Sequence, residues 1–313
     1  MDYGVMLGSD IKIRHLVLVV AIFEYGSLAR ASEGLFMTQP ALSRALKEAE
    51  TAVGGALFER TRQGMLATPA GKAYVEHARS ILGEVETLRR RVRELNDPNS
   101  SSVSVGAFVT GANLLVPRAV AHLAEDHPNT IIRISEAPPE TLIQELITGD
   151  LDLLVGRITP HPSTAQLKLV SLYREPYRIV AKQGHPALER HNKKLHRLAE
   201  FPWAMPIAGT PLYDSLIDEF NASGVPLPKR RLECATPAPL RTLLLESGYL
   251  AIMQESMVET EPQLQMHSLK ISGLAQDVGY MLSPDRPLTR ATELLIDYLT
   301  SEANRIGQQL ASL

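Results

Sequence analysis

A short amphipathic helix between residues 35 and 50, LFMTQPALSRALKEAE, constrains the fold of this chain more than any other segment. Thr38 is a residue type that caps helices, and Pro40 tolerates the first helical turn because no intrahelical amide bond is needed there. We therefore predict that a helix starts at Thr38 and that the Thr38 side chain accepts a hydrogen bond from the first turn. The apolar residues that follow have the helical spacing i, i+3, i+4 and i+7, and they are Leu42, Ala45, Leu46 and Ala49. One side of this helix is thus predicted to pack in a core.

The opposite side of the same helix is polar and carries no acid. Its members are Gln39, Ser43, Arg44 and Lys47. An amide, a hydroxyl, a guanidinium and an ammonium are the groups that contact base edges and phosphates. Taken alone, such a side is more often an ordinary solvated helix face. The neighbouring segments therefore decide between the two interpretations.

Two further helices are predicted immediately before this one. The first has an apolar stripe made of Leu16, Val19, Val20 and Phe23. Gly26 ends that helix, and Ser27 can cap a short second one. The second helix contains Leu28, Ala31 and Leu35, which leaves Phe36 and Met37 as the join to the polar-faced helix. This spacing predicts a helix-turn-helix, whose second helix enters the DNA major groove.

A hairpin is predicted after the helix-turn-helix. Residues 56–58 and 65–68 have strand-like composition and flank the polar segment 59–64. The hairpin would place Arg60 and Arg62 near a DNA backbone or minor groove.

The segments GSLARASEGLFMTQPALSRALKEAE and LFERTRQGMLATPAG resemble the winged helix-turn-helix of LysR-type transcriptional regulators over residues 15–71. Ala49 and Ala67 stand where that family commonly has leucine, and Gly55 stands where a larger residue is usual, so we expect a thinner core there. The pattern and the resemblance together predict a DNA interface made of Ser27, Arg30, Thr38, Gln39, Pro40, Ser43, Arg44, Lys47, Arg60 and Arg62.

A long helix is predicted to start at Thr68-Pro69. Its apolar residues alternate spacings of four and three, and they are Tyr74, Ala78, Ile81, Val85, Leu88, Val92 and Leu95. A stripe of this kind predicts pairing with a partner helix, and the alternative is docking on its own chain. The resemblance implies that this helix is a dimerisation linker, so we expect a dimer or a dimer of dimers.

Beyond a predicted hinge at 98–102, strands and helices alternate, which predicts an α/β fold. The predicted strands are 103–106, 130–136, 151–156, 177–181, 203–207, 231–233 and 249–253, and the helices are 114–125, 140–148, 213–221 and 240–247. GDLDLLVGR at 149–157, Glu175-Pro176 and His185-Pro186 resemble the effector-binding part of the same regulators. The resemblance implies a two-lobed fold like a type II periplasmic binding protein.

The whole chain is therefore expected to be an α+β multidomain protein. Its expected parts are a winged helix-turn-helix at 1–71, a linker helix at 72–97, the hinge, and an effector-binding domain at 103–313. Within that domain we expect lobe I at about 103–170 and 270–313 and lobe II at about 171–269.

A small-molecule effector is expected between the lobes, at loops that follow strands. Helix amino ends at those loops would favour an anionic group. The candidate effector-binding residues are Phe108, Val109, Thr110, Pro138, Pro139, Gly209, Thr210 and Thr236. A threonine in front of a helix is more often only a cap, so the hydroxyls of Thr110 and Thr210 have both interpretations.

Composition agrees with a regulator and excludes several other classes. The net charge of −3 shows that DNA binding must depend on local placement of cations, because bulk charge is slightly acidic. A single cysteine, Cys234, excludes an intrachain disulfide and a cysteine-based zinc cluster. The sequence contains no metal-binding histidine spacing, nucleophile elbow, phosphate loop or dinucleotide fingerprint, so we expect neither an enzyme, a cofactor nor a metal.

We expect a cytoplasmic regulator without a membrane segment or targeting signal. Its expected partners are double-stranded operator DNA, a small-molecule effector and a second copy of itself, and RNA polymerase is a further candidate. Two alternatives remain open. The chain could be a solute-binding protein with an N-terminal docking module, or a hydrolase built on the α/β half.

Overall fold

The computed structural model of this chain describes residues 11–62, 64–96, 101–108, 111–160, 162–189, 194–234, 236–284 and 286–311. The chain divides into two compact units, Met1–Pro98 with Gln144–Leu151 and Asn99–Ile143 with Asp152–Leu313. Each unit has its own hydrophobic core. Part of the predicted hinge at 98–102 lies outside the described residues.

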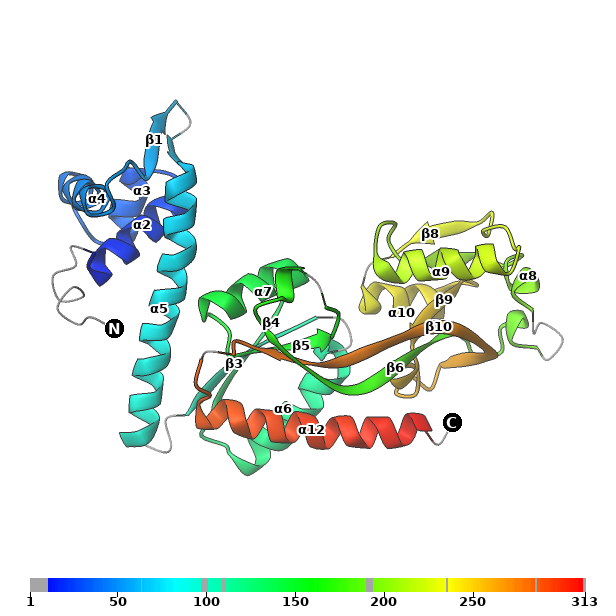
Figure 1. Cartoon of the computed structure of the whole chain (residues 1–313). Coiled ribbons are helices and arrows are strands. Elements are labelled where there is room, and N and C mark those ends of the chain that lie inside the picture. Colours follow the sequence, from blue (N-terminus) through cyan, green and yellow to red (C-terminus); the bar gives the residue numbers. More distant parts are fainter. Residues whose placement is uncertain are drawn as a thin grey trace. The chain divides into compact units, whose positions relative to one another are not determined.

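The first unit contains a winged helix-turn-helix followed by a long helix (Figure 1). Its elements are α2 (Ile13–Tyr25), α3 (Leu28–Gly34), α4 (Gln39–Val53), β1 (Phe58–Thr61), β2 (Gly64–Ala67) and α5 (Pro69–Asn96). Gly26 ends α2 with a φ of 64°, and the Ser27 side chain caps α3 by accepting a hydrogen bond from the Arg30 amide. The predicted order of helices and turns is thereby confirmed.

Two local predictions in this unit were wrong. Thr38 is the N-cap of α4 but its side chain makes no capping bond. Pro40 occupies the second helical position and has no amide, which removes one of the two donors that a cap normally satisfies. Phe23 does not join the core of α2: it is 39% exposed, and the Arg79 guanidinium lies 5.6 Å from its ring centre. The buried residues of that helix that the predicted stripe missed are His15, Leu18, Ala21 and Ile22.

The first strand of the wing extends further toward the tip of the hairpin than predicted. Residues 59–61 belong to β1, so Arg60 lies in a strand, opposite Met65 of β2. Gly64 has a φ of 126°, and a Cβ atom there would lie 2.3 Å from the Gly26 carbonyl oxygen. Glycine therefore allows the wing to approach the turn between α2 and α3, where the Met65 amide donates to the Gly26 carbonyl at 2.8 Å.

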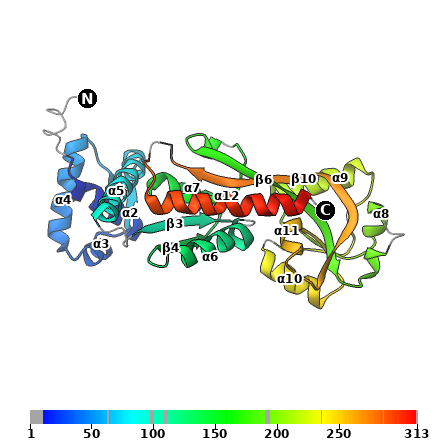
Figure 2. The same ribbon diagram turned by 90° about the horizontal axis from the view of Figure 1, so that it is seen from below.

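The second unit is built on one sheet that has eight strands within the described residues. In chain order they are β3 (Ser102–Ala107), β4 (Ile131–Glu136), β5 (Leu153–Arg157), β6 (Lys168–Lys182), β7 (Trp203–Met205), β8 (Arg231–Glu233), β9 (Leu250–Gln254) and β10 (Leu264–Leu282). The order across the sheet is β4-β3-β5-β10-β6-β9-β7-β8. Strands β6 and β10 are antiparallel to each other and run side by side through the unit (Figures 1 and 2).

Helices pack on both halves of this sheet. They are η1 (Gly111–Leu115), α6 (Val116–Asp126), α7 (Pro139–Thr148), η2 (Pro162–Thr164), η3 (Pro186–Leu188), α8 (Leu195–Leu198), α9 (Pro211–Ala222), α10 (Pro237–Glu246), α11 (Glu255–Val258) and α12 (Arg290–Ala311). One of them, α7, is shared with the first unit, which contains its residues from Gln144 onward. Helices α6 and α12 pack on one core together with β3 and β5. Helix α9 packs on another core with β7 and β9.

The two cores just described, which are not the only hydrophobic clusters of this unit, share the strands β6 and β10. Tyr173 of β6 and Val278 of β10 belong to the first core. Tyr177 and Leu274, a few residues further along the same strands, belong to the second. The expected two-lobed α/β architecture is thus present, and β6 and β10 connect its lobes.

Candidate DNA-binding face and effector pocket

Helix α4 presents a polar side opposite its buried side. Leu42, Leu46 and Ala49 are buried in the core of the first unit. Three side chains of the predicted face are exposed, namely Gln39, Arg44 and Lys47. The fourth, Ser43, is half-buried. The structure therefore has the predicted separation of core and polar sides.

The basic side chains of the predicted DNA interface make no ion pair with any carboxylate of the described residues. They are Arg30, Arg44, Lys47, Arg60 and Arg62, and all are exposed. Several other arginines of the unit are paired, with distances of 2.8 Å from Arg14 to Glu48 and 2.9 Å from Arg79 to Glu24. The cations of the predicted interface are thus available to phosphates.

The other predicted DNA-contacting residues flank the starts of two helices. Thr38 and Pro40 are exposed at the start of α4, and Ser27 is half-buried as the cap of α3. Phe36, for which the pattern predicts no role, is 98% exposed and adopts a φ of 54° in the turn before α4. An exposed aromatic ring therefore lies in the turn that leads into α4.

The apolar stripe of α5 is partly covered by its own chain. Tyr74 packs against the helix-turn-helix core and Ala78 is buried, so these two members do not form free surface. Val85 is half-buried. The remaining four members are exposed: Ile81 by 47%, Leu88 by 63%, Val92 by 47% and Leu95 by 78%. A stripe of this exposure is available to a partner helix from Ile81 onward.

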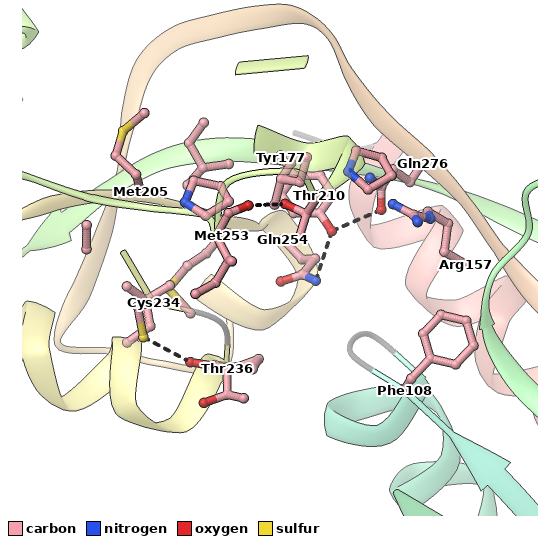
Figure 3. Close-up of a pocket in the computed structure, with 18 of the residues that line it drawn as sticks. Phe108, Arg157, Tyr177, Met205, Thr210, Cys234, Thr236, Met253, Gln254 and Gln276 are labelled. Atoms are coloured by element: carbon pink, nitrogen blue, oxygen red, sulfur yellow. Dashed lines mark hydrogen bonds between the residues drawn. The ribbon is translucent and has the colours of Figure 1, made fainter. Parts of the chain in front are cut away.

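The second unit contains a cavity of about 410 Å³ (Figure 3). Phe108 and Arg157 lie on one side of it, and Met205, Met253 and Cys234 lie on the other. The volume is within the range of small-molecule sites. The walls are mainly apolar and come from Phe108, Pro139, Ala204, Met205, Pro206, Ile207, Pro211, Leu212, Pro237, Leu240, Ile252 and Met253.

One wall of the cavity is polar and internally ordered. The Tyr177 hydroxyl donates to Oε1 of Gln276 at 3.1 Å and accepts from Nε2 of Gln254 at 3.1 Å. These side chains come from the neighbouring strands β6, β10 and β9. Arg157, at the end of β5, lies next to Gln276 (Figure 3). The cavity thus has a cluster of hydrogen-bonding groups beside a guanidinium.

Thr210 uses its hydroxyl within the protein. Its Oγ1 donates to the Ile207 carbonyl at 2.7 Å and accepts from the Tyr213 amide at 3.3 Å. Its only hydroxyl hydrogen is therefore engaged, and the predicted donation from Thr210 to a ligand is not available in this geometry. The alternative interpretation, a helix cap, describes what this side chain does.

Five of the eight predicted effector-binding residues line the cavity. They are Phe108, Pro139, Gly209, Thr210 and Thr236. Pro138 is not among its lining residues. Val109 and Thr110 lie outside the described residues.

The charged and polar lining residues that the prediction missed include Glu140, Arg157, Tyr177, Gln254 and Gln276. Arg157 follows a predicted strand, so the rule that ligands collect at the carboxyl ends of strands could have identified it. Gln276 lies in β10, which was not predicted, and its proximity to Tyr177 follows from strand pairing alone.

The helix amino ends at the cavity offer fewer amide donors than predicted. Helices α7, α9 and α10 begin at Pro139, Pro211 and Pro237, and proline has no amide hydrogen. Pro239 removes another donor from the first turn of α10, and Glu140 places a negative charge in the first turn of α7. Arg157 therefore favours an anionic ligand more than the helix ends do.

We also searched the described residues for metal sites and for membrane-spanning helices. These residues include no group of three or more His, Cys, Asp or Glu side chains placed to hold a metal ion. None of the helices found among them combines the length and hydropathy required to cross a bilayer.

Comparison with known protein families identifies a helix-turn-helix part and a ligand-binding part in this chain. A family model described as "Bacterial regulatory helix-turn-helix protein, lysR family" matches residues 13–72. A second, described as "LysR substrate binding domain", matches residues 96–304.

Relatives and solved structures match over nearly the whole chain. The "SDS degradation transcriptional activation protein" of Pseudomonas sp. (strain ATCC 19151) is 31% identical over 302 residues, which are 94% of this chain and 97% of that protein. The HTH-type transcriptional regulator YdcI of Escherichia coli (strain K12) is 26% identical over 303 residues, 95% of this chain and 97% of that protein. A full-length OxyR variant from Pseudomonas aeruginosa has a similar fold, with a TM-score of 0.68 at 20% identity over 92% of this chain and 94% of that one.

The curated relatives are transcriptional regulators and not enzymes, so the hydrolase alternative is rejected. The helix-turn-helix, the wing and the two-lobed ligand domain occur together and in the family's order. The chain belongs to the LysR family of DNA-binding transcriptional regulators, which carry an effector-binding domain.

Proposed function

We propose that this regulator reads operator DNA through one face, composed of Ser27, Arg30, Thr38, Gln39, Pro40, Ser43, Arg44, Lys47, Arg60 and Arg62. The observation that carries the proposal is the set of exposed cations on α3, α4 and the wing without an ion pair to any described carboxylate. Polar groups of α4 would contact base edges in the major groove, and the arginines of the wing would contact the backbone or the minor groove. Sequence preference would then come from α4, and the wing would add affinity.

We infer that two chains pair through the exposed stripe of α5. Four large apolar side chains on one stripe would be covered by the same stripe of a second copy. Pairing of this kind would present two copies of α4 to the two halves of an inverted repeat. A dimer of dimers would need further contacts from the second unit.

The cavity of the second unit is the proposed effector site, and the proposed effector is anionic. Arg157 supports the anionic assignment because it makes no ion pair with a described carboxylate. Effector binding would favour one angle between the two cores and so change the spacing of the DNA-reading helices. Because we propose operator DNA as its target, we place the protein in the cytoplasm, where RNA polymerase is a candidate partner.

The test is to identify the DNA that the protein occupies in cells and to measure binding of the purified full chain to those fragments. We expect specific retention of fragments that contain an inverted repeat, with a scrambled fragment of equal length as the control. A solute-binding protein with a docking module would retain neither fragment specifically. The genes beside the occupied sites would also suggest the metabolite class.

A further inference from the structure

The cavity of the second unit combines a long apolar wall with one cationic end. Large apolar side chains from several elements form that wall, namely Met205, Leu212, Leu240, Ile252 and Met253. Methionine side chains are flexible and polarizable, so a wall containing two of them can adapt to apolar groups of different shape. The wall favours an alkyl or aryl group over a sugar or another densely hydroxylated molecule.

The cationic end is equipped to bind a carboxylate. Arg157 is half-buried, and among the described residues no carboxylate forms an ion pair with it. Oε1 of Gln276 already accepts from Tyr177, which leaves the amide nitrogen of Gln276 as a donor. A guanidinium beside an amide donor (Figure 3) matches the two oxygens of one carboxylate.

The cavity is not equipped for a second anionic group. Glu140 is the other charged residue among the described lining residues, and its charge would repel a second carboxylate. The rest of the lining is largely apolar and would leave such a group desolvated without a partner. A dicarboxylate is therefore a poorer fit than a monocarboxylate of equal length.

We infer that the effector of this regulator is an amphipathic monocarboxylate. Its carboxylate binds Arg157 and Gln276, and its alkyl or aryl part lies along the wall toward Met253 and Cys234. The inference rests on the proposed function of this cavity as the effector site and adds the chemical class of the ligand.

The sole cysteine of the chain provides a direct measure of occupancy. Cys234 lines the cavity, so a ligand that fills the apolar part should slow alkylation of its thiol by N-ethylmaleimide. The assay uses the full chain without DNA, and Cys234→Ser confirms that the signal comes from this thiol. The probe is octanoate, compared with 1-octanol and octylamine, which have the same tail, and with octanedioate, which has a second carboxylate.

We expect octanoate to protect the thiol at concentrations about ten- to a hundredfold lower than the three other molecules, the range given by a hydrogen bond to a charged group. Arg157→Gln should weaken protection by octanoate about ten- to a hundredfold, and Arg157→Lys should restore part of it because the charge remains without the planar fork. The matched control is Arg133→Gln, an exposed arginine of β4 that does not line the cavity, and it should leave protection unchanged. Circular dichroism and emission from Trp203, the single tryptophan, verify that each variant is folded.

Three results would overturn the inference: equal protection by octanol, stronger protection by octanedioate, or unchanged protection in folded Arg157→Gln. The first two need only the wild-type chain, so they remain decisive even if a variant does not fold. Because no DNA is present, failed protection with intact operator binding would reject the ligand class and leave the proposed regulator in place. Intact protection without specific operator binding would reject the proposed DNA-reading face and keep the ligand.

Discussion

The carboxylate of Glu50 accepts a hydrogen bond from the Leu57 amide at 2.8 Å, and this bond connects the last turns of α4 to the entrance of the wing. The same oxygen lies 3.4 Å from the Phe58 amide. Leu57 and Phe58 are both buried. One side chain of α4 thus helps to hold the strand that carries Arg60.

Replacing Glu50 by alanine should lower the free energy of unfolding by about 1–3 kcal/mol, because a buried amide loses its acceptor. Glu50→Gln keeps an acceptor oxygen and should cost less. Glu48→Ala is the matched control, since Glu48 is exposed and forms a surface ion pair with Arg14, whose loss should cost about 0–1 kcal/mol. Urea denaturation measures all three, and equal losses at Glu50 and Glu48 would show that the bond contributes little.

Arg44→Ala should weaken specific operator binding by about 1–3 kcal/mol and leave binding to unrelated DNA less affected. Arg62→Ala should instead weaken binding to all sequences alike. It should also reduce, by about one, the slope of the logarithm of the binding constant against the logarithm of the salt concentration. Arg91→Ala, an exposed residue in the distal part of α5, is the control of equal charge. Fluorescence titrations with specific and unrelated duplexes at several salt concentrations distinguish a loss of specificity from a general loss of affinity. Wild-type operator affinity in folded Arg44→Ala would exclude the polar side of α4 as the DNA-reading face.

Leu88→Glu should favour monomers if the stripe of α5 is the dimer interface. Leu88 is 63% exposed in the single chain, so the change should leave the chain folded but bury a charge between two helices. We expect the dimer to weaken by at least about 2 kcal/mol. Sedimentation equilibrium measures it, with Arg91→Glu as the control on the same helix, and an intact Leu88→Glu dimer would place the interface elsewhere.

Thr210→Val should lower stability rather than ligand affinity. The Thr210 hydroxyl holds the first turn of α9 through Tyr213, and loss of a cap costs about 0.5–2 kcal/mol. Ser215→Ala, in the same helix, removes an exposed hydroxyl that donates to Pro211 and should change stability by about 0.5 kcal/mol or less. If Thr210→Val kept its stability in urea denaturation but lost octanoate protection of Cys234, the hydroxyl would be assigned to the ligand.

Glu175→Gln should remove part of the pH dependence of stability. Burial raises the pKa of Glu175 above its ordinary value of 4.5, and Glu255 adds to the rise, while hydrogen bonds from Ser256 oppose it. Between 4.5 and the raised pKa the unfolded chain has released this proton and the folded chain has kept it, so stability falls as pH rises.

The slope from one such group is at most about 1.4 kcal/mol per pH unit. Glutamine has no proton to lose, so the stability of Glu175→Gln relative to wild type should increase from pH 4.5 toward neutrality. Urea denaturation at a series of pH values measures the difference. Parallel curves for the two proteins would mean that Glu175 does not titrate in this range.

Local sequence was sufficient for the helix-turn-helix and insufficient for the wing. The spacing from Leu42 to Ala49 and the cap at Ser27 are properties of a few adjacent residues, and these helices were predicted correctly. Residues 59–61 are polar and resemble a loop, yet they form a strand because β2 pairs with them. Strand formation there depends on a partner and not on composition.

The same limit applies to the cavity. Tyr177, Gln254 and Gln276 are far apart in sequence and meet because β10, β6 and β9 are neighbours in the sheet. No local pattern contains that order. Helix α12 is different: Leu295, Leu299 and Ile306 have a helical spacing, so its sequence could have predicted it.

The two cores of the second unit are joined by a two-stranded ribbon whose regular part is short. Between the cores, Ala275, Gln276 and Asp277 of β10 face Pro176, Glu175 and Arg174 of β6. With Val278 opposite Tyr173 they form a run of four pairs, and the register shifts on both sides of that run. Two-stranded ribbons tolerate more twist than wide sheets. A change of angle between the cores therefore requires torsion of this ribbon. Gln276 belongs both to the ribbon and to the cavity wall, so we expect a molecule bound at the cavity to act on the twist of the ribbon.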